Sequence, residues 1–259
     1  MLGKDLLVYL SLKYKGDFKK MVKAIHEKET VKDEIAIEEI KKIKSNYITV
    51  LDDAYPDGLR HIYMPPLVLY YYGDISLLKS EEVRLAVVGS RECTDYGRDI
   101  TKELVTPLAS KNRIIVSGLA RGIDAIAHDT CIKNKGKTIA VLGSGIDYPY
   151  PSSNKSLYEE IKKHHLLISE YPNKTEPTPD NFPARNRIVA GIADKVLVTE
   201  AYVNSGTNIT VLYALRQGKD VMAVPHEAKK NSACNRLIQD GAFLVESAED
   251  VLYLTETKF

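Results

Sequence analysis

Two arginines, an asparagine and an aromatic ring lie together in the stretch FPARNR, residues 182–187. A guanidinium group forms forked hydrogen bonds to phosphate oxygens. An aromatic ring such as that of Phe182 stacks on a nucleobase, and Asn186 has an amide that can bond to a base edge. These residue types indicate a ligand with phosphates and bases, although a charged helix start would use the same residues.

The spacing of Arg185 and Arg187 leaves two arrangements open. In an extended segment, residues two apart point to the same side, and both arginines then contact the ligand. In an α-helix they diverge by about 200°, so that one of them is structural and pairs with a carboxylate such as Glu170 or Glu200. Asn186 is likewise open between a base contact and a cap of the following helix.

Short apolar runs alternate with helical patterns over most of the chain. Continuous apolar runs separated by helices predict a mostly parallel sheet with helices on both faces, which is a Rossmann-like α/β fold. The predicted strands are 84–89, 113–118, 138–143, 166–170, 195–200, 220–225 and 243–246, and helical patterns include 97–110, 123–136 and 208–219.

The loops that follow these strands hold further candidates. Ligands of such sheets bind beyond the carboxyl ends of the strands, where the strand order reverses. Glycine and serine expose backbone N–H groups that suit phosphate, although a glycine there can also mark only a tight turn. The candidates in these loops are Gly89, Ser90, Arg91, Gly118, Arg121, Gly122, Ser205, Gly206 and Thr207, which join Phe182, Arg185, Asn186 and Arg187 as predicted binding residues.

Other polar residues in these regions have simpler interpretations. We expect Asp124 and Asn208 to cap helices and His128 to be a packed, hydrogen-bonded histidine. The sequence has no GxxxxGK[ST], and Tyr148 replaces the third glycine of a dinucleotide fingerprint. It also has no HExxH, Cys/His cluster or GxSxG elbow, so we predict neither a cofactor nor a metal.

Composition limits the class of protein. The 259 residues carry 36 Lys and Arg against 35 Asp and Glu, a formal net charge of +1, so anion binding must come from a local patch. The cysteines Cys93, Cys131 and Cys234 read as free thiols in a reducing cytoplasm. We expect no signal peptide, and no apolar run approaches the length of a membrane span.

The chain divides into unequal parts. Residues 1–45 are rich in Lys and Glu and lack proline, which predicts a small helical N-terminal element. Residues 46–259 form the predicted main domain, in which residues 46–80 are a lead-in segment rich in proline and tyrosine. We interpret those tyrosines as packing residues, and we expect the apolar positions Ile209, Val211, Leu212 and Leu215 to pack a helix.

Several segments resemble the DprA/Smf family (DNA-processing protein A) in order and spacing. The resemblance covers roughly residues 46–255 and implies a bacterial, cytoplasmic protein that binds single-stranded DNA. It further implies a homodimer that protects incoming DNA and loads the RecA recombinase in natural transformation or recombination, without turnover chemistry. The matching segments are VVGSR (87–91), SGLARGIDAIAH (117–128), GKTIAVLGSGID (136–147), FPARNRIVAGIADKVLVTEA (182–201) and SGTNIT (205–210).

The chain also departs from that family's pattern. His226 and Cys234 stand where glycine is usual, and Ser152 stands where a basic residue is frequent, which puts one phosphate contact in doubt. The helical N-terminal part is short, and the chain stops soon after the α/β domain. We therefore do not expect added duplex binding through a C-terminal winged-helix domain.

Two other function classes stay open at this point. Lysine-decarboxylase-like phosphoribohydrolases cleave nucleoside monophosphates and carry GGxGTxxE, but Thr210 takes the place of the glutamate here, and Asn204 and Ser205 replace the paired glycines. Glu200, at the end of a predicted strand nearby, is the residue that could replace the missing catalytic glutamate. The third possibility is a sensor that binds a small nucleotide in the same loops.

Overall fold

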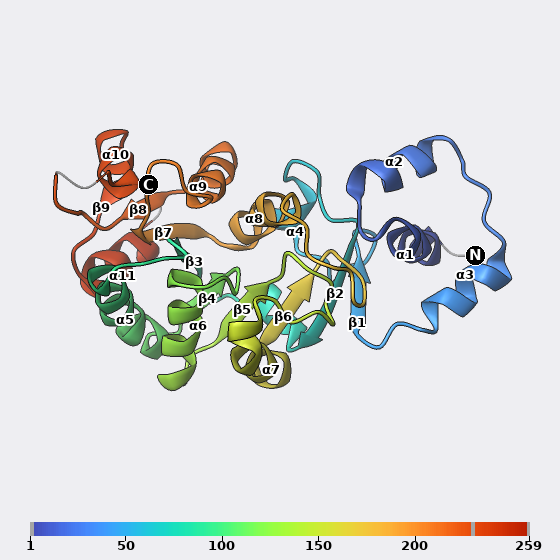
Figure 1. The fold of residues 1–259 in the computed structure, drawn as a ribbon, viewed down its shortest axis with the longest axis horizontal. Helices are drawn as coiled ribbons and strands as arrows, with labels where there is room; N and C mark the ends of the chain where they lie inside the picture. Colours follow the sequence, from blue (N-terminus) through green and yellow to red (C-terminus); the bar gives the residue numbers. More distant parts are fainter. Residues whose placement is uncertain (1–2, 229–230, 258–259) are drawn as a thin grey trace.

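The N-terminal part of the chain is helical, as predicted. The computed structural model describes residues 3–228 and 231–257. It begins with α1 (Gly3–Tyr14), α2 (Phe18–His26) and α3 (Asp33–Ile40), which lie at one end of an elongated molecule (Figure 1). Leu10 and Met21 share a core cluster with Tyr70 and Leu167 of the sheet, so these helices pack onto the α/β part. The division of the chain at residue 46 stays a prediction.

A nine-stranded sheet forms the centre of the molecule in the order β1-β2-β6-β5-β4-β3-β7-β8-β9. All neighbouring pairs from β6 to β9 in this order are parallel, and β1 and β2 extend the sheet as antiparallel strands. The strands are β1 (Asn46–Thr49), β2 (Val68–Gly73), β3 (Arg84–Gly89), β4 (Ile114–Ser117), β5 (Thr138–Val141), β6 (Leu166–Ser169), β7 (Lys195–Glu200), β8 (Val221–Ala223) and β9 (Phe243–Leu244). The predicted strands and the Rossmann-like class are confirmed, while β1 and β2 arise within the lead-in segment.

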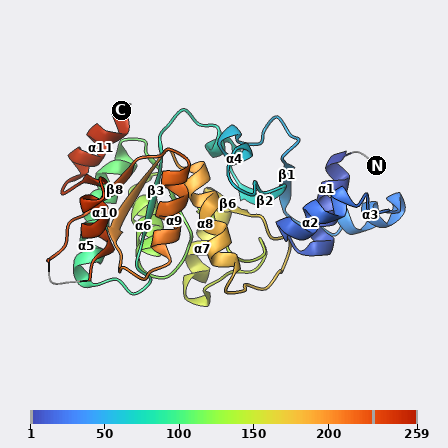
Figure 2. The ribbon, with the colours of Figure 1, turned by 90° about the horizontal axis from the view of Figure 1, so that it is seen from above.

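Side chains of the central strands alternate between two helical layers. In β3, Ala86 and Val88 belong to one core cluster, and Leu85 and Val87 belong to another. Alternate residues of a strand point to opposite faces, so an uninterrupted apolar run must be covered on both sides. The helices are α5 (Asp95–Ser110), α6 (Ile123–Lys133), α7 (Lys155–His164) and α11 (Ala248–Glu256) on one face, and α4 (Asp57–Arg60), α8 (Asn181–Ile192), α9 (Thr207–Arg216) and α10 (Ala233–Gln239) on the other (Figures 1 and 2).

The strand order reverses beside β3. The chain places β4, β5 and β6 successively on one side of β3 and then returns through α8 to place β7 on its other side. The loops after β3 and β7 therefore diverge from each other at the carboxyl edge of the sheet, which is where such folds bind ligands. Because α8 runs back toward the start of β7, its first turns lie at this same edge.

The described residues contain no helix that is both long and apolar enough to span a membrane. The three cysteines are free, with Cys131 and Cys234 buried and Cys93 partly buried.

Candidate functional site

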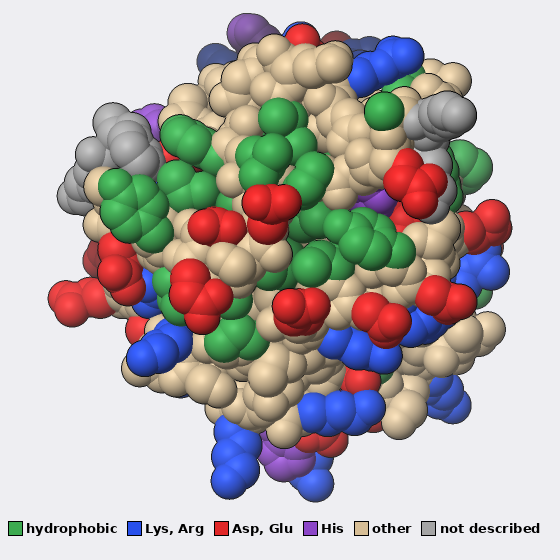
Figure 3. Space-filling model, turned by 90° about the vertical axis from the view of Figure 1, so that its left-hand side faces the viewer, with side chains coloured by type: hydrophobic (Ala, Val, Ile, Leu, Met, Phe, Trp, Pro, Cys, Tyr) green, Lys and Arg blue, Asp and Glu red, His purple; other side chains and the backbone are tan. Residues whose placement is uncertain are grey.

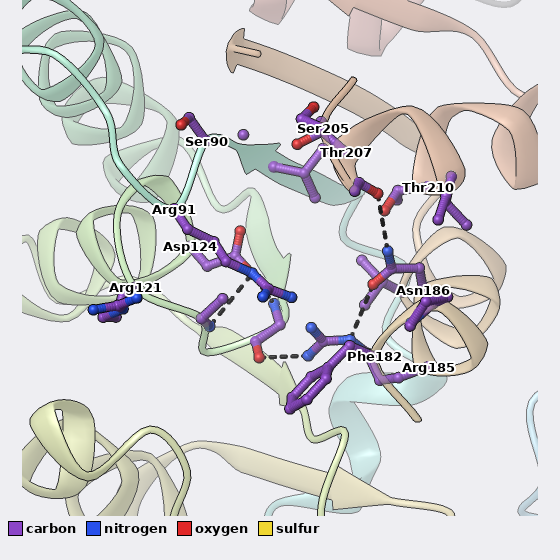
Figure 4. Close-up of a pocket in the computed structure, with 18 of the residues that line it drawn as sticks. Ser90, Arg91, Arg121, Asp124, Phe182, Arg185, Asn186, Ser205, Thr207 and Thr210 are labelled. Carbon is purple, nitrogen blue, oxygen red and sulfur yellow. Dashed lines mark hydrogen bonds between the residues drawn. The ribbon is translucent and has the colours of Figure 1, made fainter. Parts of the chain in front are cut away.

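A cavity of about 680 Å³ opens at the point of strand-order reversal (Figure 4). It is lined by the loops after β3, β4 and β7 and by the first turns of α8. Its volume lies within the range of small-ligand pockets. The predicted binding residues that line it are Gly89, Ser90, Arg91, Gly118, Arg121, Phe182, Arg185, Asn186, Ser205, Gly206 and Thr207. The other two predicted binding residues, Gly122 and Arg187, do not line the cavity.

Gly122 has a backbone role beside this cavity. It precedes α6 as its N-cap with φ at 73°, a left-handed conformation that favours glycine. A Cβ atom there would lie 2.2 Å from the carbonyl oxygen of Ser90. Gly122 therefore permits the loop after β4 to approach the loop after β3.

Arg187 is a structural residue. Residues 182–187 lie within α8, so the side chains of Arg185 and Arg187 diverge around the helix. The Arg187 guanidinium donates to both carboxylate oxygens of Glu170 at 2.7 and 2.5 Å, and to the carbonyl of Met64. Burial lowers the Arg187 pKa, but the Glu170 carboxylate more than offsets this, so the pKa is raised. The structure thus selects Glu170, rather than Glu200, as the partner of the structural arginine.

Arg185 is also buried, but without such a partner. Its side chain is 3% exposed, and its Nη1 donates to the carbonyls of Gly118 and Val141 at the ends of β4 and β5. Among residues 3–228 and 231–257, no carboxylate lies within salt-bridge distance of it. Burial lowers the pKa of Arg185, the charge of the buried Asp124 carboxylate partly offsets this, and the positive charge of Arg91 lowers the pKa further. A buried cation that forms no close ion pair is costly, and an anion in the cavity would compensate it further.

Glycine at position 118 allows this arrangement. A Cβ atom there would lie 2.3 Å from Nη1 of Arg185, so a larger residue would displace the guanidinium. The glycine after β4 therefore does more than form a turn, because it also makes room for the buried arginine.

Arg91 and Phe182 form a stacked pair at the cavity wall. The guanidinium carbon of the exposed Arg91 lies 5.3 Å from the centroid of the half-buried Phe182 ring. The ring of Tyr150 also packs on Phe182, with 5.5 Å between the two ring centroids. Arg121 is exposed and lies to one side of Arg91 and Arg185 (Figure 4). Positive charge and aromatic surface are thus adjacent, as in sites that hold single-stranded nucleic acids.

Several predicted N–H donors are already bonded within the protein. The amides of Ser90, Gly118 and Ser205 donate to the Glu200 carbonyl, the Asp124 carboxylate and the Tyr202 carbonyl. These three N–H groups are therefore not available to a ligand. No acceptor within the described part of the chain takes the amides of Gly206 and Thr207 at the start of α9. The positive end of that helix faces the cavity through them.

The predicted helix caps take other roles. Glycines, rather than Asp124 and Asn208, occupy the N-cap positions of α6 and α9. Asp124 accepts hydrogen bonds from the amides of Gly118 and Ala120 and so holds the loop after β4. Burial raises the pKa of its carboxyl group. The cap prediction fails because each side chain turns toward its preceding loop, where Asn208 donates to the carbonyl of Val203.

Asn186 is not a helix cap either, because it lies in the middle of α8. Its Oδ1 accepts a hydrogen bond from Nε of Arg185 at 3.1 Å, and its Nδ2 donates to the carbonyl of Gly206 at 3.3 Å. Asn186 therefore orients Arg185 and connects α8 to the loop after β7, as the dashed lines in Figure 4 show.

His128 is a packed histidine, as predicted. It is fully buried with Nδ1 2.6 Å from the hydroxyl of Thr138, and burial lowers its pKa to about 3. Glu200, the residue considered as a substitute acid, is 3% exposed and accepts from the amide and hydroxyl of Thr94. The described residues form no cluster of three or more His, Cys, Asp or Glu that could hold a metal.

The three departures from the family pattern lie outside the cavity lining. The His226 ring packs edge-on against Tyr96 with 5.0 Å between the ring centroids, and Cys234 is fully buried in the first turn of α10. Ser152 is exposed. Sequence reasoning missed Glu92 and Tyr202, which line the cavity. Glu92 directly follows Arg91 in the loop after β3, so its place in the sequence was enough to predict that it lies at the cavity.

Comparison with known proteins agrees with this geometry. The sequence model of DNA recombination-mediator protein A matches residues 46–256. The DNA processing protein DprA of Streptococcus pneumoniae is 45% identical over 206 residues, which is 79% of this chain and 72% of that protein.

Two solved structures are similar over most of the chain. The crystal structure of DprA from Streptococcus pneumoniae superposes with a TM-score of 0.81 at 40% identity, covering 93% of this chain and 82% of that one. DprA from Helicobacter pylori, whose structure was described for its single-stranded DNA binding mode, gives 0.75 at 28% identity and covers 83% and 99% of the two chains. This chain belongs to the DNA recombination-mediator protein A family, which is the DprA/Smf family.

Proposed function

We propose that this chain binds single-stranded DNA in the cavity at the strand-order reversal. The observation that carries the proposal is Arg185, a buried guanidinium that lines the cavity and forms no salt bridge within the described residues, so that the more distant Asp124 carboxylate only partly balances its charge. A phosphate would supply further negative charge. Arg91 adds a second guanidinium, the start of α9 adds free N–H groups, and Phe182 adds a surface for a base.

The predicted binding residues take unequal parts in this proposal. Arg91, Arg121 and Arg185 contact phosphates, assisted by Gly206 and Thr207, while Phe182 stacks a base. Asn186 positions Arg185, and Arg187 holds α8 through Glu170. Gly89, Ser90, Gly118, Gly122 and Ser205 shape the loops. Sequence preference is expected to be weak, because phosphate contacts and stacking carry little base information.

Family membership supports the cellular role. In the cytoplasm, the chain would protect incoming single strands and load the RecA recombinase onto them in natural transformation or recombination. Loading predicts that substoichiometric amounts of this chain accelerate assembly of RecA on a strand already covered by single-strand-binding protein. An unchanged assembly rate would count against this role.

We also infer a homodimer. Large hydrophobic side chains are exposed on α9, β9 and α11, namely Leu212, Leu215, Leu244 and Tyr253. The side of the molecule that is on the left in Figure 1, where α10, β9 and α11 lie, shows hydrophobic groups among acidic ones (Figure 3). Leu212 and Leu215 are about half exposed, so they do not serve the helix packing expected for them, whereas Val211 does. Exposed apolar patches of this kind mark interaction sites.

Binding without turnover is the proposed mode of action. The glutamate of the phosphoribohydrolase signature is replaced by Thr210, and Glu200 is occupied by Thr94. Incubation with nucleoside monophosphates should release no free base. Release of base that is lost in an Arg185 variant would instead support an enzyme.

The decisive experiment is a titration with single- and double-stranded oligomers of increasing length. The proposal predicts that affinity rises strongly with single-strand length and exceeds the affinity for duplex at every length. A sensor of small nucleotides would bind mononucleotides as tightly as oligomers. Equal affinity for single and double strands would also contradict the proposal.

A further inference from the structure

We propose that Tyr150 is a second base-contacting residue and that the strand leaves the cavity over Phe182 and Tyr150. This assignment rests on the proposed function, because it assumes that a single strand occupies the cavity. It adds a path for the strand beyond the residues that line the cavity.

The Tyr150 ring continues the aromatic surface of Phe182 toward solvent. Phe182 lines the cavity, and the centroid of the Tyr150 ring lies 5.5 Å from that of Phe182, with an angle of 37° between the planes. Tyr150 is 44% exposed. A base stacked on Phe182 would therefore have a neighbouring aromatic surface for the next nucleotide, outside the cavity. Stacking of this kind tolerates any sequence, because every base has a π-face.

The loop that carries Tyr150 is held in place. Prolines flank Tyr150 on both sides, at positions 149 and 151, and the Ser144 hydroxyl donates to the carbonyl of Tyr148 at 2.8 Å. Nδ2 of Asn154 donates to the carbonyls of Leu119 and Ala120, which belong to the loop after β4. A fixed aromatic ring loses little conformational entropy when it binds a base.

The charges around the cavity favour this exit over the opposite one. A second exposed tyrosine, Tyr202, lines the cavity from the loop after β7, whose Ser205 lies across the cavity from Phe182 (Figure 4), and is 41% exposed. Its hydroxyl donates to Glu200 at 3.2 Å. Burial raises the pKa of Tyr202, and the charges of Glu200 and Glu92 raise it further. Glu200 is buried, but the exposed Glu92 carboxylate near Tyr202 would repel a phosphate backbone.

The Tyr150 end carries positive charge instead. Arg121 lies on the loop that Asn154 holds, one residue beyond the Ala120 carbonyl, and Lys155 begins α7 directly after Asn154. Both side chains are exposed. A strand that leaves over Phe182 and Tyr150 therefore meets the cations Arg121 and Lys155, whereas one that leaves past Tyr202 meets the exposed carboxylate of Glu92.

The test compares Tyr150→Ala with Tyr202→Ala on the loop after β7 and with a control outside the cavity lining, Tyr63→Ala, whose side chain is 68% exposed. Binding is measured by fluorescence anisotropy of labelled oligothymidylates in a length series. Tyr150→Ala should weaken binding of the longer oligomers about tenfold, in the lower part of the range for loss of one base stack. The shortest oligomers that bind should be unaffected, since they fill only the cavity. Tyr150→Phe should restore affinity, Tyr202→Ala should cause no loss that grows with oligomer length, and Tyr63→Ala should bind like the unmodified chain at every length.

Each other outcome overturns a defined part of the account. Tyr150→Ala with full affinity for long strands, measured on a protein with unchanged unfolding midpoint, would overturn the assignment while leaving the proposed function intact. Loss in Tyr202→Ala but not in Tyr150→Ala would reverse the path. Failure of the unmodified chain to bind any single strand would overturn the proposed function itself, together with this assignment.

Discussion

Replacement of Arg187 by methionine and replacement of Arg185 by methionine are expected to have opposite consequences, although both lie on α8 two positions apart. Arg187 is paired with Glu170 and does not line the cavity. Arg185 lines the cavity and forms no salt bridge within the described residues, although the buried Asp124 carboxylate lies near enough to raise its pKa. Arg187→Met should therefore reduce stability and spare DNA binding, whereas Arg185→Met should reduce DNA binding and spare stability.

The cost of Arg187→Met follows from the burial of its partner. Glu170 is 5% exposed, so its carboxylate would stay buried without a counter-ion, and breaking such a pair costs about 3–5 kcal/mol. Replacing both partners by apolar residues of similar volume is often close to neutral. The double variant Arg187→Met with Glu170→Met should therefore recover most of the lost stability.

The cost of Arg185→Met is divided differently. The carbonyls of Gly118 and Val141 lose a donor, at about 1 kcal/mol for each hydrogen bond. The buried Asp124 carboxylate also loses a favourable interaction, whereas the cost of holding the guanidinium away from water disappears. These effects oppose each other, so we expect a small net change in stability. Loss of a charged hydrogen bond to phosphate, worth about 1.5–3 kcal/mol, should weaken single-strand affinity at least tenfold.

Both quantities can be measured on the same protein preparations. Urea unfolding gives the stability change, and anisotropy titration of a labelled oligothymidylate gives the affinity, expressed per active molecule. An Arg187→Met protein with the unfolding midpoint of the unmodified chain would refute the structural role of Arg187. An Arg185→Met protein that is well folded and binds with full affinity would refute the role of Arg185 as the anion partner.

Three further predictions concern separate features. Arg91→Ala should weaken binding across sequences and lower the slope of log affinity against log salt by about one, and an unchanged slope at two or more salt concentrations would exclude a phosphate contact. Because the pKa of buried His128 falls to about 3 from about 6.5 in the unfolded chain, the unfolded state binds more protons between these values, and unfolding free energy should fall by about 2 kcal/mol from pH 7 to pH 5. Urea midpoints at both pH values test this, with a smaller pH effect expected in His128→Gln. Leu215→Asp should lower the hydrodynamic mass from that of two chains to that of one, whereas a single-chain mass before substitution would count against the dimer.

Much of the fold follows from local sequence patterns. The buried parallel strands have continuous apolar runs, and these runs cannot satisfy both faces without helices on each side. The antiparallel strands β1 and β2 at one end of the sheet were harder to predict because they lie in a segment that contains three prolines, Pro56, Pro65 and Pro66. The segment VLYYYG of β2 (Val68–Gly73) nevertheless has the aromatic and β-branched composition of a strand.

The site was predictable in location but not in its internal division of roles. Strand-end loops identified the cavity, because the carboxyl edge of the sheet and the reversal of strand order bring them together. Arg187 rather than Arg185 is held in a salt bridge because Glu170 lies beside that position of α8. That is a tertiary contact, which the local sequence does not reveal. The roles of Asp124 and Asn186 likewise depended on hydrogen bonds across loops, which spacing along the chain does not determine.

The central claim is that a single strand occupies this cavity, and crosslinking tests it most directly. A single-stranded oligomer that carries 5-iododeoxyuridine would be irradiated in complex with the chain, and the crosslinked peptides would be mapped. The account predicts crosslinks at Phe182 and Tyr150 that disappear when unlabelled single strand is added in excess. Competed crosslinks confined to the N-terminal helices, or to the face formed by α5 and α11, would contradict it.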